Sequence, residues 1–178
     1  MCPLPSGIIV RGFGTTTSTD PKLEYSKDGG NNWAVGINAP SGLEAVIGIK
    51  NTSLGIIATF GTGAGDGKYA YSADGITWSS LQTAYNNCSG CIVVGDFNNR
   101  VYFACIQPNN IREIAYITTL GGAYNPCTLP PVGDGSKARV ISGIGAYISS
   151  KYYFVGYVAP NDINEPAIWE SSDGVNFT

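Results

Sequence analysis

The side chains that could carry chemistry here are carboxylates, arginines and thiols, because the 178-residue sequence contains no histidine. The absence of histidine excludes Ser-His-Asp and Cys-His mechanisms and histidine-ligated metal sites. A glycosidase would need two carboxyl groups held about 5 to 10 Å apart across a sugar. Five acids remain when those in turns and polar loops are set aside: Glu24, Glu44, Asp96, Glu113 and Glu170. Their spacing in the sequence does not single out any two of them as a catalytic pair. Solvated or turn-forming acids are therefore favoured over a catalytic pair.

The five cysteines give one close pair, Cys88 and Cys91, with Cys105 and Cys127 in the same region and Cys2 far away. An all-cysteine zinc site needs four converging thiolates, usually from two close pairs. Cys91 and Cys105 fall on adjacent predicted strands, so a disulfide between them is geometrically feasible. Small buried thiols are the favoured interpretation, with a disulfide or a metal site as the alternatives. An odd count leaves one thiol unpaired unless chains are crosslinked.

The glycine-rich stretch 61–67 lacks the Lys-Ser/Thr ending and the following helix of a phosphate-binding loop. We expect it to be a hairpin loop between two strands. Similar polar loops at 14–21, 107–111 and 159–166 are expected to gather with it on one face, where binding surfaces are usually built.

A short repeat indicates the elements that position these side chains. A hydroxyl residue, an aspartate, a glycine and an aromatic recur in three clear copies, and a degraded fourth copy has Leu120 in place of the aspartate. The copies are Ser26, Asp28, Gly30 and Trp33; Ser72, Asp74, Gly75 and Trp78; Ser171, Asp173, Gly174 and Phe177; and, degraded, Thr118, Gly121 and Tyr124. Their first residues lie 46, 46 and 53 positions apart. A period in the forties is typical of a four-stranded propeller blade.

Strand-like segments recur in phase with this motif. An apolar, β-rich segment precedes each copy at 7–13, 55–60, 101–106 and 152–157, and another lies upstream of the last three at 45–49, 91–95 and 140–144. The predicted fold is all-β and propeller-like, a single domain or partial propeller over 1–178. Its four antiparallel blade repeats are expected near 8–39, 43–84, 91–131 and 138–178. No inner strand is predicted before Ile8, and the last outer strand would begin at Thr178.

The first copy matches the pattern S-x-D-x-G-x-x-W in full and resembles the Asp-box, or bacterial neuraminidase repeat, of sialidase-type β-propellers. Serine and aspartate can hydrogen-bond backbone groups within a turn, and glycine accepts positive φ. The resemblance implies that the boxes lie on the hairpin between third and fourth strands, away from any catalytic centre. Because this repeat occurs in hydrolases, lectin-like modules, receptors and phage structural proteins, it indicates fold more than function.

Sialidase chemistry, as the resemblance implies, needs an arginine triad, a tyrosine nucleophile assisted by glutamate and an acidic proton donor. Arg11 lies in the context Val-Arg-Gly-Phe instead of the Arg-Ile-Pro of the first sialidase arginine, and Arg100 follows two asparagines in a predicted hairpin turn. These contexts disfavour a sialidase. No catalytic residue, cofactor or metal ligand is predicted.

The composition of the chain argues against two classes of partner, nucleic acids and membranes. The net charge is −3 and the lysines and arginines are scattered, so nucleic acid is not expected to bind. No apolar run reaches the ~20 residues of a membrane span, and we predict neither membrane insertion nor a secretory signal.

Only 13% of residues are charged. These features favour a non-enzymatic structural or recognition module, such as a phage head, tail or fibre protein or another virion or extracellular surface component. The alternative is a glycan-binding or sialidase-like glycoside-hydrolase domain, or a fragment of one.

Unfinished repeats at the two ends suggest assembly. An open arc of blades would leave sheet edges such as 45–49 or 140–144 facing a gap, and an unpaired edge recruits any strand that reaches it. Protein partners or self-assembly are therefore expected, with a glycan as a further candidate ligand.

Overall fold

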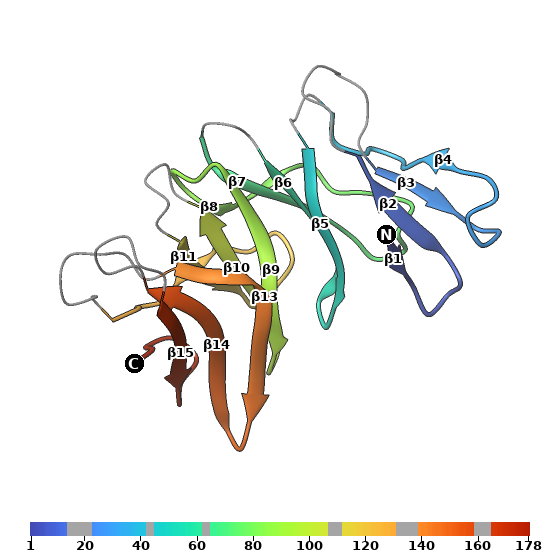
Figure 1. Ribbon diagram of the computed structural model, residues 1–178. Helices are drawn as coiled ribbons and strands as arrows, with labels where there is room; N and C mark the ends of the chain where they lie inside the picture. The colour runs from blue at the N-terminus through green and yellow to red at the C-terminus, as the bar shows by residue number, and fades with distance from the viewer. Residues whose placement is uncertain (14–22, 42–44, 62–64, 107–111, 131–138, 159–164) are drawn as a thin grey trace.

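The computed structural model describes residues 1–13, 23–41, 45–61, 65–106, 112–130, 139–158 and 165–178 (Figure 1). Every regular element within these ranges is a β-strand. The all-β class predicted from the sequence is therefore confirmed. The physical basis is a chain rich in β-branched and aromatic residues, punctuated by glycine and asparagine at the turns.

The strands form four consecutive antiparallel meanders, called units 1 to 4 below. Unit 1 contains β1 (Cys2–Pro3), β2 (Ile9–Gly12), β3 (Leu23–Ser26) and β4 (Ala34–Val35). Unit 2 contains β5 (Ala45–Thr52), β6 (Gly55–Gly61), β7 (Gly67–Ser72) and β8 (Gln82–Tyr85). Unit 3 contains β9 (Gly90–Phe97), β10 (Arg100–Ile106), β11 (Arg112–Ile117) and β12 (Asn125–Pro126). Unit 4 contains β13 (Arg139–Ile148), β14 (Lys151–Val158) and β15 (Glu165–Ser171).

The sheets differ from the four separate blades expected from the sequence. Units 2 and 3 merge into one curled eight-stranded sheet, because β6 pairs with β9 through Gly61 and Gly90. These residues have no side chains, so the two backbones approach closely: a Cβ added to Gly90 would lie 3.5 Å from the Cα of Gly61. Unit 1 forms a sheet of four strands and unit 4 a sheet of three.

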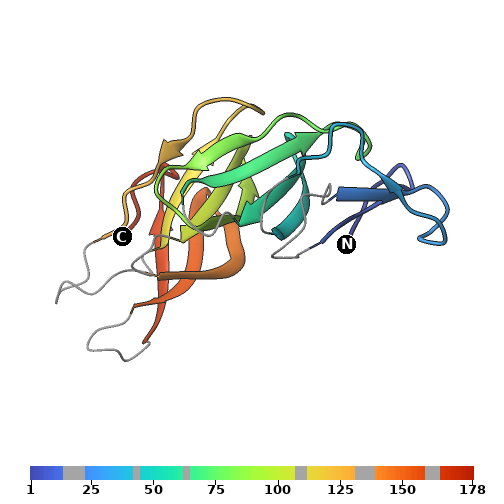
Figure 2. The same cartoon turned by 90° about the horizontal axis from the view of Figure 1, so that it is seen from above.

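The units follow one another along a curved array, with the two chain ends at opposite extremes (Figures 1 and 2). Figure 1 shows unit 1 at one end, in blue, and unit 4 at the other, in orange and red. The first and last units therefore each have one face turned away from the rest of the chain.

Both ends differ in detail from the predicted boundaries. A strand does precede Ile8, because Cys2 pairs with Val10 and Pro3 with Ile9. At two residues, β1 is too short for a sequence pattern to reveal. At the other end, Thr178 and Glu170 exchange two backbone hydrogen bonds of 3.0 Å, at the position where the outer strand of unit 4 was expected.

The core lies in the joints between successive units. Val10 and Leu23 of unit 1 pack against Ile56, Phe60 and Trp78 of unit 2. Two similar clusters join unit 2 to unit 3 and unit 3 to unit 4. Because adjacent residues of a strand face opposite sides of the sheet, a central strand such as β6 is buried on both faces. This double burial explains the unbroken apolar runs in the sequence.

Candidate functional site

The second box is a turn closed by side-chain hydrogen bonds to the backbone. The Ser72 hydroxyl donates to Asp74 Oδ1 (3.0 Å) and accepts from the Gly75 amide (2.9 Å). Asp74 Oδ1 then accepts from the amides of Ile76 and Thr77, both at 2.8 Å. Gly75 has φ +78°, a conformation that favours glycine. The Asp74 carboxylate thus stabilises the turn by hydrogen-bonding backbone amides of the same loop.

The fourth box repeats this geometry almost atom for atom. Ser171 donates to Asp173 at 2.7 Å and accepts from the amide of Gly174, whose φ is +71°. Asp173 accepts from the amides of Val175 and Asn176, both at 2.8 Å. Two boxes far apart in sequence therefore share one hydrogen-bonding pattern, which the spacing of Ser, Asp and Gly sets locally.

The first box is one residue longer and closes in a related way. The Ser26 hydroxyl donates to Asp28 (2.7 Å) and accepts from the Gly30 amide (2.9 Å). Asp28 accepts from both the backbone amide and the side-chain amide of Asn32. The additional residue is accommodated because Gly29 and Gly30 both have positive φ.

These hydrogen bonds set the charge state of the box carboxylates. Donation from the backbone amide of Asn32, then from its side chain and from Ser26, lowers the pKa of Asp28 to about 2. The backbone amide of Thr77 is the main cause of the lowered pKa of Asp74, and that of Asn176 has the same effect on the pKa of Asp173. All three groups are therefore anions at neutral pH and unsuited to donating a proton.

The degraded third copy is arranged differently. Gly121 has φ +72°, like the box glycines, and Tyr124 is half-buried. Thr118 is exposed, whereas Ser26, Ser72 and Ser171 are all buried. The buried position at the end of the strand belongs to Ile117, which pairs with Val101 as Ser72 pairs with Ile56. The third copy therefore has the length of the first, with Ile117 in the serine position and Thr119 in the aspartate position.

Two boxes also join neighbouring units. Ile37, which follows unit 1, donates to Ile76 O and accepts from Trp78 N at 2.8 and 2.9 Å. Thr128, which follows unit 3, makes the same pair of bonds with Val175 and Phe177 of the fourth box. Each forms an isolated parallel bridge, and Trp78 and Phe177 are each only 3% exposed. These two boxes therefore form a turn within their own unit and also bind the preceding unit through backbone hydrogen bonds, a contact called the clamp below.

The third box is joined to unit 2 through tyrosines. Its Gly121 amide donates to the Tyr69 hydroxyl at 3.2 Å, and the Tyr124 ring lies 5.4 Å from that of Tyr85. The Asn86 side chain also donates to the Tyr124 hydroxyl at 2.7 Å. This joint therefore uses side-chain contacts where the other two use a backbone bridge.

The four described acids that lie outside the boxes and polar loops have separate local environments and do not share one cleft. Glu24 accepts from Arg11 at 2.6 Å, and Glu170 accepts from Lys151 at 2.8 Å, on units at opposite ends of the chain. Asp96 accepts two hydrogen bonds of 2.6 Å from the Ser53 amide and hydroxyl, which tie unit 3 to unit 2. Burial raises the pKa of Glu113, on β11. Glu44 lies outside the described residues.

Two arginines, Arg11 and Arg100, make structural contacts. Arg11 stacks on the Trp33 ring with 3.9 Å between guanidinium carbon and ring centroid. Arg100 donates to the backbone oxygen of Asp173 at 2.6 Å and lies over the ring of Tyr116. Arg100 thus reaches from the β9–β10 hairpin of unit 3 to the fourth box, a role that its place in a predicted hairpin did not reveal.

Three buried thiols gather in unit 3 and at its junction with unit 2. Cys91 and Cys105 are register partners on β9 and β10, as expected from the strand assignment. Cys88 packs in the same cluster, and all five cysteines are free thiols. A hydrogen bond from Cys105 lowers the pKa of Cys88 to about 7, whereas burial raises the pKa values of Cys91 and Cys105. In the part of the chain that the structure describes, no group of three metal-binding side chains has the geometry to hold an ion.

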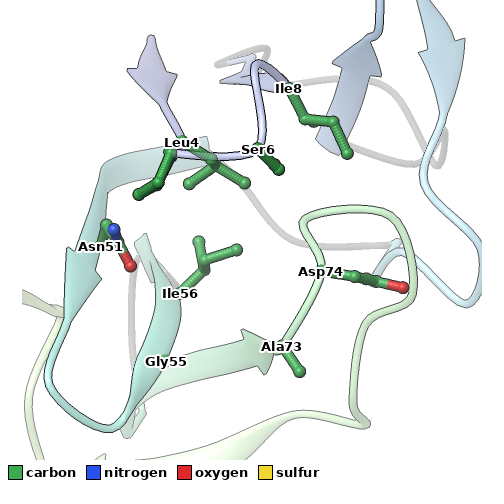
Figure 3. A pocket seen from close by; sticks show the side chains of 9 residues that line it. Leu4, Ser6, Ile8, Asn51, Gly55, Ile56, Ala73 and Asp74 are labelled. Atoms are coloured by element: carbon green, nitrogen blue, oxygen red, sulfur yellow. The ribbon is translucent and has the colours of Figure 1, made fainter.

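A pocket of about 360 Å³ lies at the joint between units 1 and 2 (Figure 3). Leu4 and Ile8 lie across from Ile56 and give it an apolar lining, and Asn51 stands at its rim. Its volume is at the low end of the 300–1,000 Å³ typical of small-molecule sites. Asp74 borders the pocket, but its carboxylate accepts hydrogen bonds within its own turn. The pocket therefore offers shape and apolar contact but no group poised for chemistry.

A more open hollow of about 270 Å³ lies beside the first box. It is lined by Tyr25, Lys27, Asp28, Asn32, Trp33 and Ala34. Two aromatic rings, an ammonium group and an amide side chain thus lie around one concave surface.

Neither a protein-family model nor a curated protein sequence matches this chain. Among the described residues there is no helix with the length and apolar character needed to cross a membrane. Of the loops predicted to form a shared binding face, 14–21, 107–111 and most of 159–166 lie outside the described residues, as do residues 62–64 of the loop at 61–67.

Proposed function

We propose that this chain is a non-enzymatic structural or recognition module of the Asp-box, propeller-like type, belonging to a virion, such as a phage head, tail or fibre, or to another extracellular surface. In this proposal the units present surfaces and loops, and the boxes keep those units in register.

The observation that carries the proposal is the use made of the box aspartates. Asp28, Asp74 and Asp173 each accept hydrogen bonds from backbone amides of their own turn. Two of the three turns also receive a bridging segment from the preceding unit. Carboxylates held as anions by several fixed donors stabilise architecture and are poor proton donors. The low charge content and the Ser/Thr/Asn/Gly-rich composition agree with a surface built for contact.

A panel of fluorogenic glycosides tests the non-enzymatic assignment. We expect no turnover by the purified chain across α- and β-linked substrates, sialosides included. Turnover that is lost in Glu24→Gln, Glu113→Gln or Glu170→Gln, with folding retained by circular dichroism, would overturn the proposal. Asp96→Asn is the matched control, because it changes a carboxylate that bonds Ser53 between units.

Glycan recognition is the second candidate, and the hollow beside the first box favours it. Trp33 and Tyr25 provide aromatic faces, and Lys27 and Asn32 provide hydrogen-bond donors next to them. Sugars present both apolar C–H faces and hydroxyl groups, so such a surface can contact both. A glycan array with the wild-type chain and Trp33→Ala tests this candidate. Binding abolished by Trp33→Ala and kept by Trp78→Phe would support it, whereas no binding to any glycan would remove it.

A further inference from the structure

One position of the repeat reveals which face of the last unit is left uncovered. The first position of each box is buried and is occupied by Ser26, Ser72, Ile117 and Ser171 in turn. The residues three positions earlier are Leu23, Tyr69, Ile114 and Ile168. Each faces the same way in its unit, because each pairs with the matching residue of the neighbouring strand: Gly12, Thr59, Ala104 and Val155. Leu23, Tyr69 and Ile114 are 0% exposed, because the following unit packs on them, whereas Ile168 is 68% exposed.

The exposed side of unit 4 is an apolar surface with a charged border. Val155, the partner of Ile168, is 41% exposed, and Tyr153 lies next to it on the same face of β14. Lys151 and Glu170 form an ion pair at its edge, with each side chain nearly half exposed. We call these five residues the trailing face: Lys151, Tyr153, Val155, Ile168 and Glu170. The opposite face of the unit is buried against unit 3 through Tyr152, Phe154 and Trp169.

The uncovered side of unit 1 has a different chemistry. Where units 2 to 4 place the buried pairs Ala58–Ala70, Phe103–Ala115 and Phe154–Trp169, unit 1 has Arg11 paired with Glu24. The Trp33 ring covers the Arg11 guanidinium at 3.9 Å. An ion pair at this position makes this face of unit 1 polar. Burying it against the apolar trailing face of another copy would cost desolvation of both charges.

We propose that the trailing face binds the trailing face of a second copy of this chain, forming a two-fold symmetric dimer through unit 4. The chemistry of the two free faces decides the arrangement, since the apolar face matches itself better than it matches the charged face of unit 1. A two-fold interface brings a residue i against j and j against i, so Lys151 of each copy can meet Glu170 of the other. The interface is inferred from the exposed side chains of unit 4 and does not depend on the proposed structural role.

Light scattering coupled to size-exclusion chromatography of the full chain tests this interface. We expect the wild-type chain to elute at twice its 18.7 kDa mass at micromolar concentration. Ile168→Asp should raise the dimer dissociation constant by roughly tenfold or more, because it places a charge at the centre of the buried patch. Ile168→Thr, which keeps a β-branched side chain, should weaken the dimer less. Val35→Asp is the matched control on unit 1, since Val35 is also exposed and lies on a strand paired with Glu24.

Charge exchange tests the two-fold geometry. Lys151→Glu and Glu170→Lys should each weaken the homodimer, and mixing the two variant chains should restore a dimer, because opposite charges then meet only across the interface while the pair within each chain stays broken. A monomeric wild-type chain would overturn the proposal. So would a dimer that Ile168→Asp leaves intact with native circular dichroism, or an assembly that Val35→Asp disrupts, because the latter would indicate head-to-tail contact. Glycoside turnover by an intact dimer would refute the proposed function and leave this interface standing.

Discussion

At the scale of single residues, the box aspartates connect sequence spacing to stability. The carboxylate accepts from amides two to four positions ahead, so the contact is local and is set by the order of residues. These donors favour the ionised form and lower the pKa of Asp28, Asp74 and Asp173. Because the pKa values lie below the ordinary value of 3.8, ionisation and folding are linked.

That linkage predicts a loss of stability in acid. The contribution of a carboxyl with a lowered pKa is present above its unfolded pKa and is lost as pH falls through the folded value, about 2 for Asp28. We expect the urea midpoint to be constant down to about pH 5 and to fall steadily toward about pH 2. Asp74→Asn, which removes one of the three titrating groups, should be less stable at neutral pH and show a shallower acid decline. An acid profile with the same slope in this variant would contradict the role given to Asp74.

At the scale of the repeated element, the box aromatic has a different environment in each unit. Trp78 and Phe177 are buried between units, Tyr124 is half-buried beside Tyr85, and Trp33 lies over Arg11 on the free side of unit 1. One sequence position therefore supplies a buried residue in two repeats and a half-buried residue in the other two. Trp78, Tyr124 and Phe177 pack at joints between units, whereas Trp33 packs on Arg11 of its own unit.

This difference predicts unequal costs of truncation. Trp78→Ala should lower the free energy of unfolding by about 3 to 5 kcal/mol, because it leaves a cavity in the joint between units 1 and 2. Trp33→Ala should cost about 1 to 2 kcal/mol, since it removes a partly exposed cation–π contact with Arg11 and the hydrogen bond from the indole to Gly30 O. Chemical denaturation of both variants measures the two values. Equal losses would mean that Trp33 is buried by a contact with another molecule.

At the scale of the whole molecule, the joining of units 2 and 3 gives the chain a continuous centre with smaller sheets at each side. β6, β9 and β10 lie inside this eight-stranded sheet and are paired on both edges. β4 and β12 contain two residues each, and all four of these residues are exposed. Local opening is easiest where strands are short and burial is slight.

Hydrogen exchange should follow this hierarchy. We expect the slowest amide exchange in β6, β9 and β10, and exchange faster by orders of magnitude in β4 and β12. Mass spectrometry of exchanged, protease-digested chain resolves these segments. If unit 1 were protected as strongly as β9, the central sheet would not be the most stable part of the fold.

Features that depend on neighbours along the chain could be predicted from the amino-acid order. The alternation of apolar segments and turns predicted an all-β fold, and the spacing of Ser, Asp and Gly matches turns whose hydrogen bonds span two to four residues. The amino-acid order also placed Cys91 and Cys105 on adjacent strands, where they are register partners. Local hydrogen bonding and strand periodicity are short-range properties, so a sequence pattern can predict them.

Features that depend on residues far apart in the chain could not be predicted and emerged from the three-dimensional packing. The joining of units 2 and 3 requires Gly61 and Gly90 to meet, and the clamps require Ile37 and Thr128 to reach the next box. The shift of the third copy onto Ile117 came from pairing with β10, where an apolar residue must face unit 2. Ile168 is exposed although Tyr69, at the same position of its repeat, is buried, because a neighbouring unit packs on Tyr69. The sequence repeats the position, but the packing of the neighbouring unit decides whether that position is core or surface.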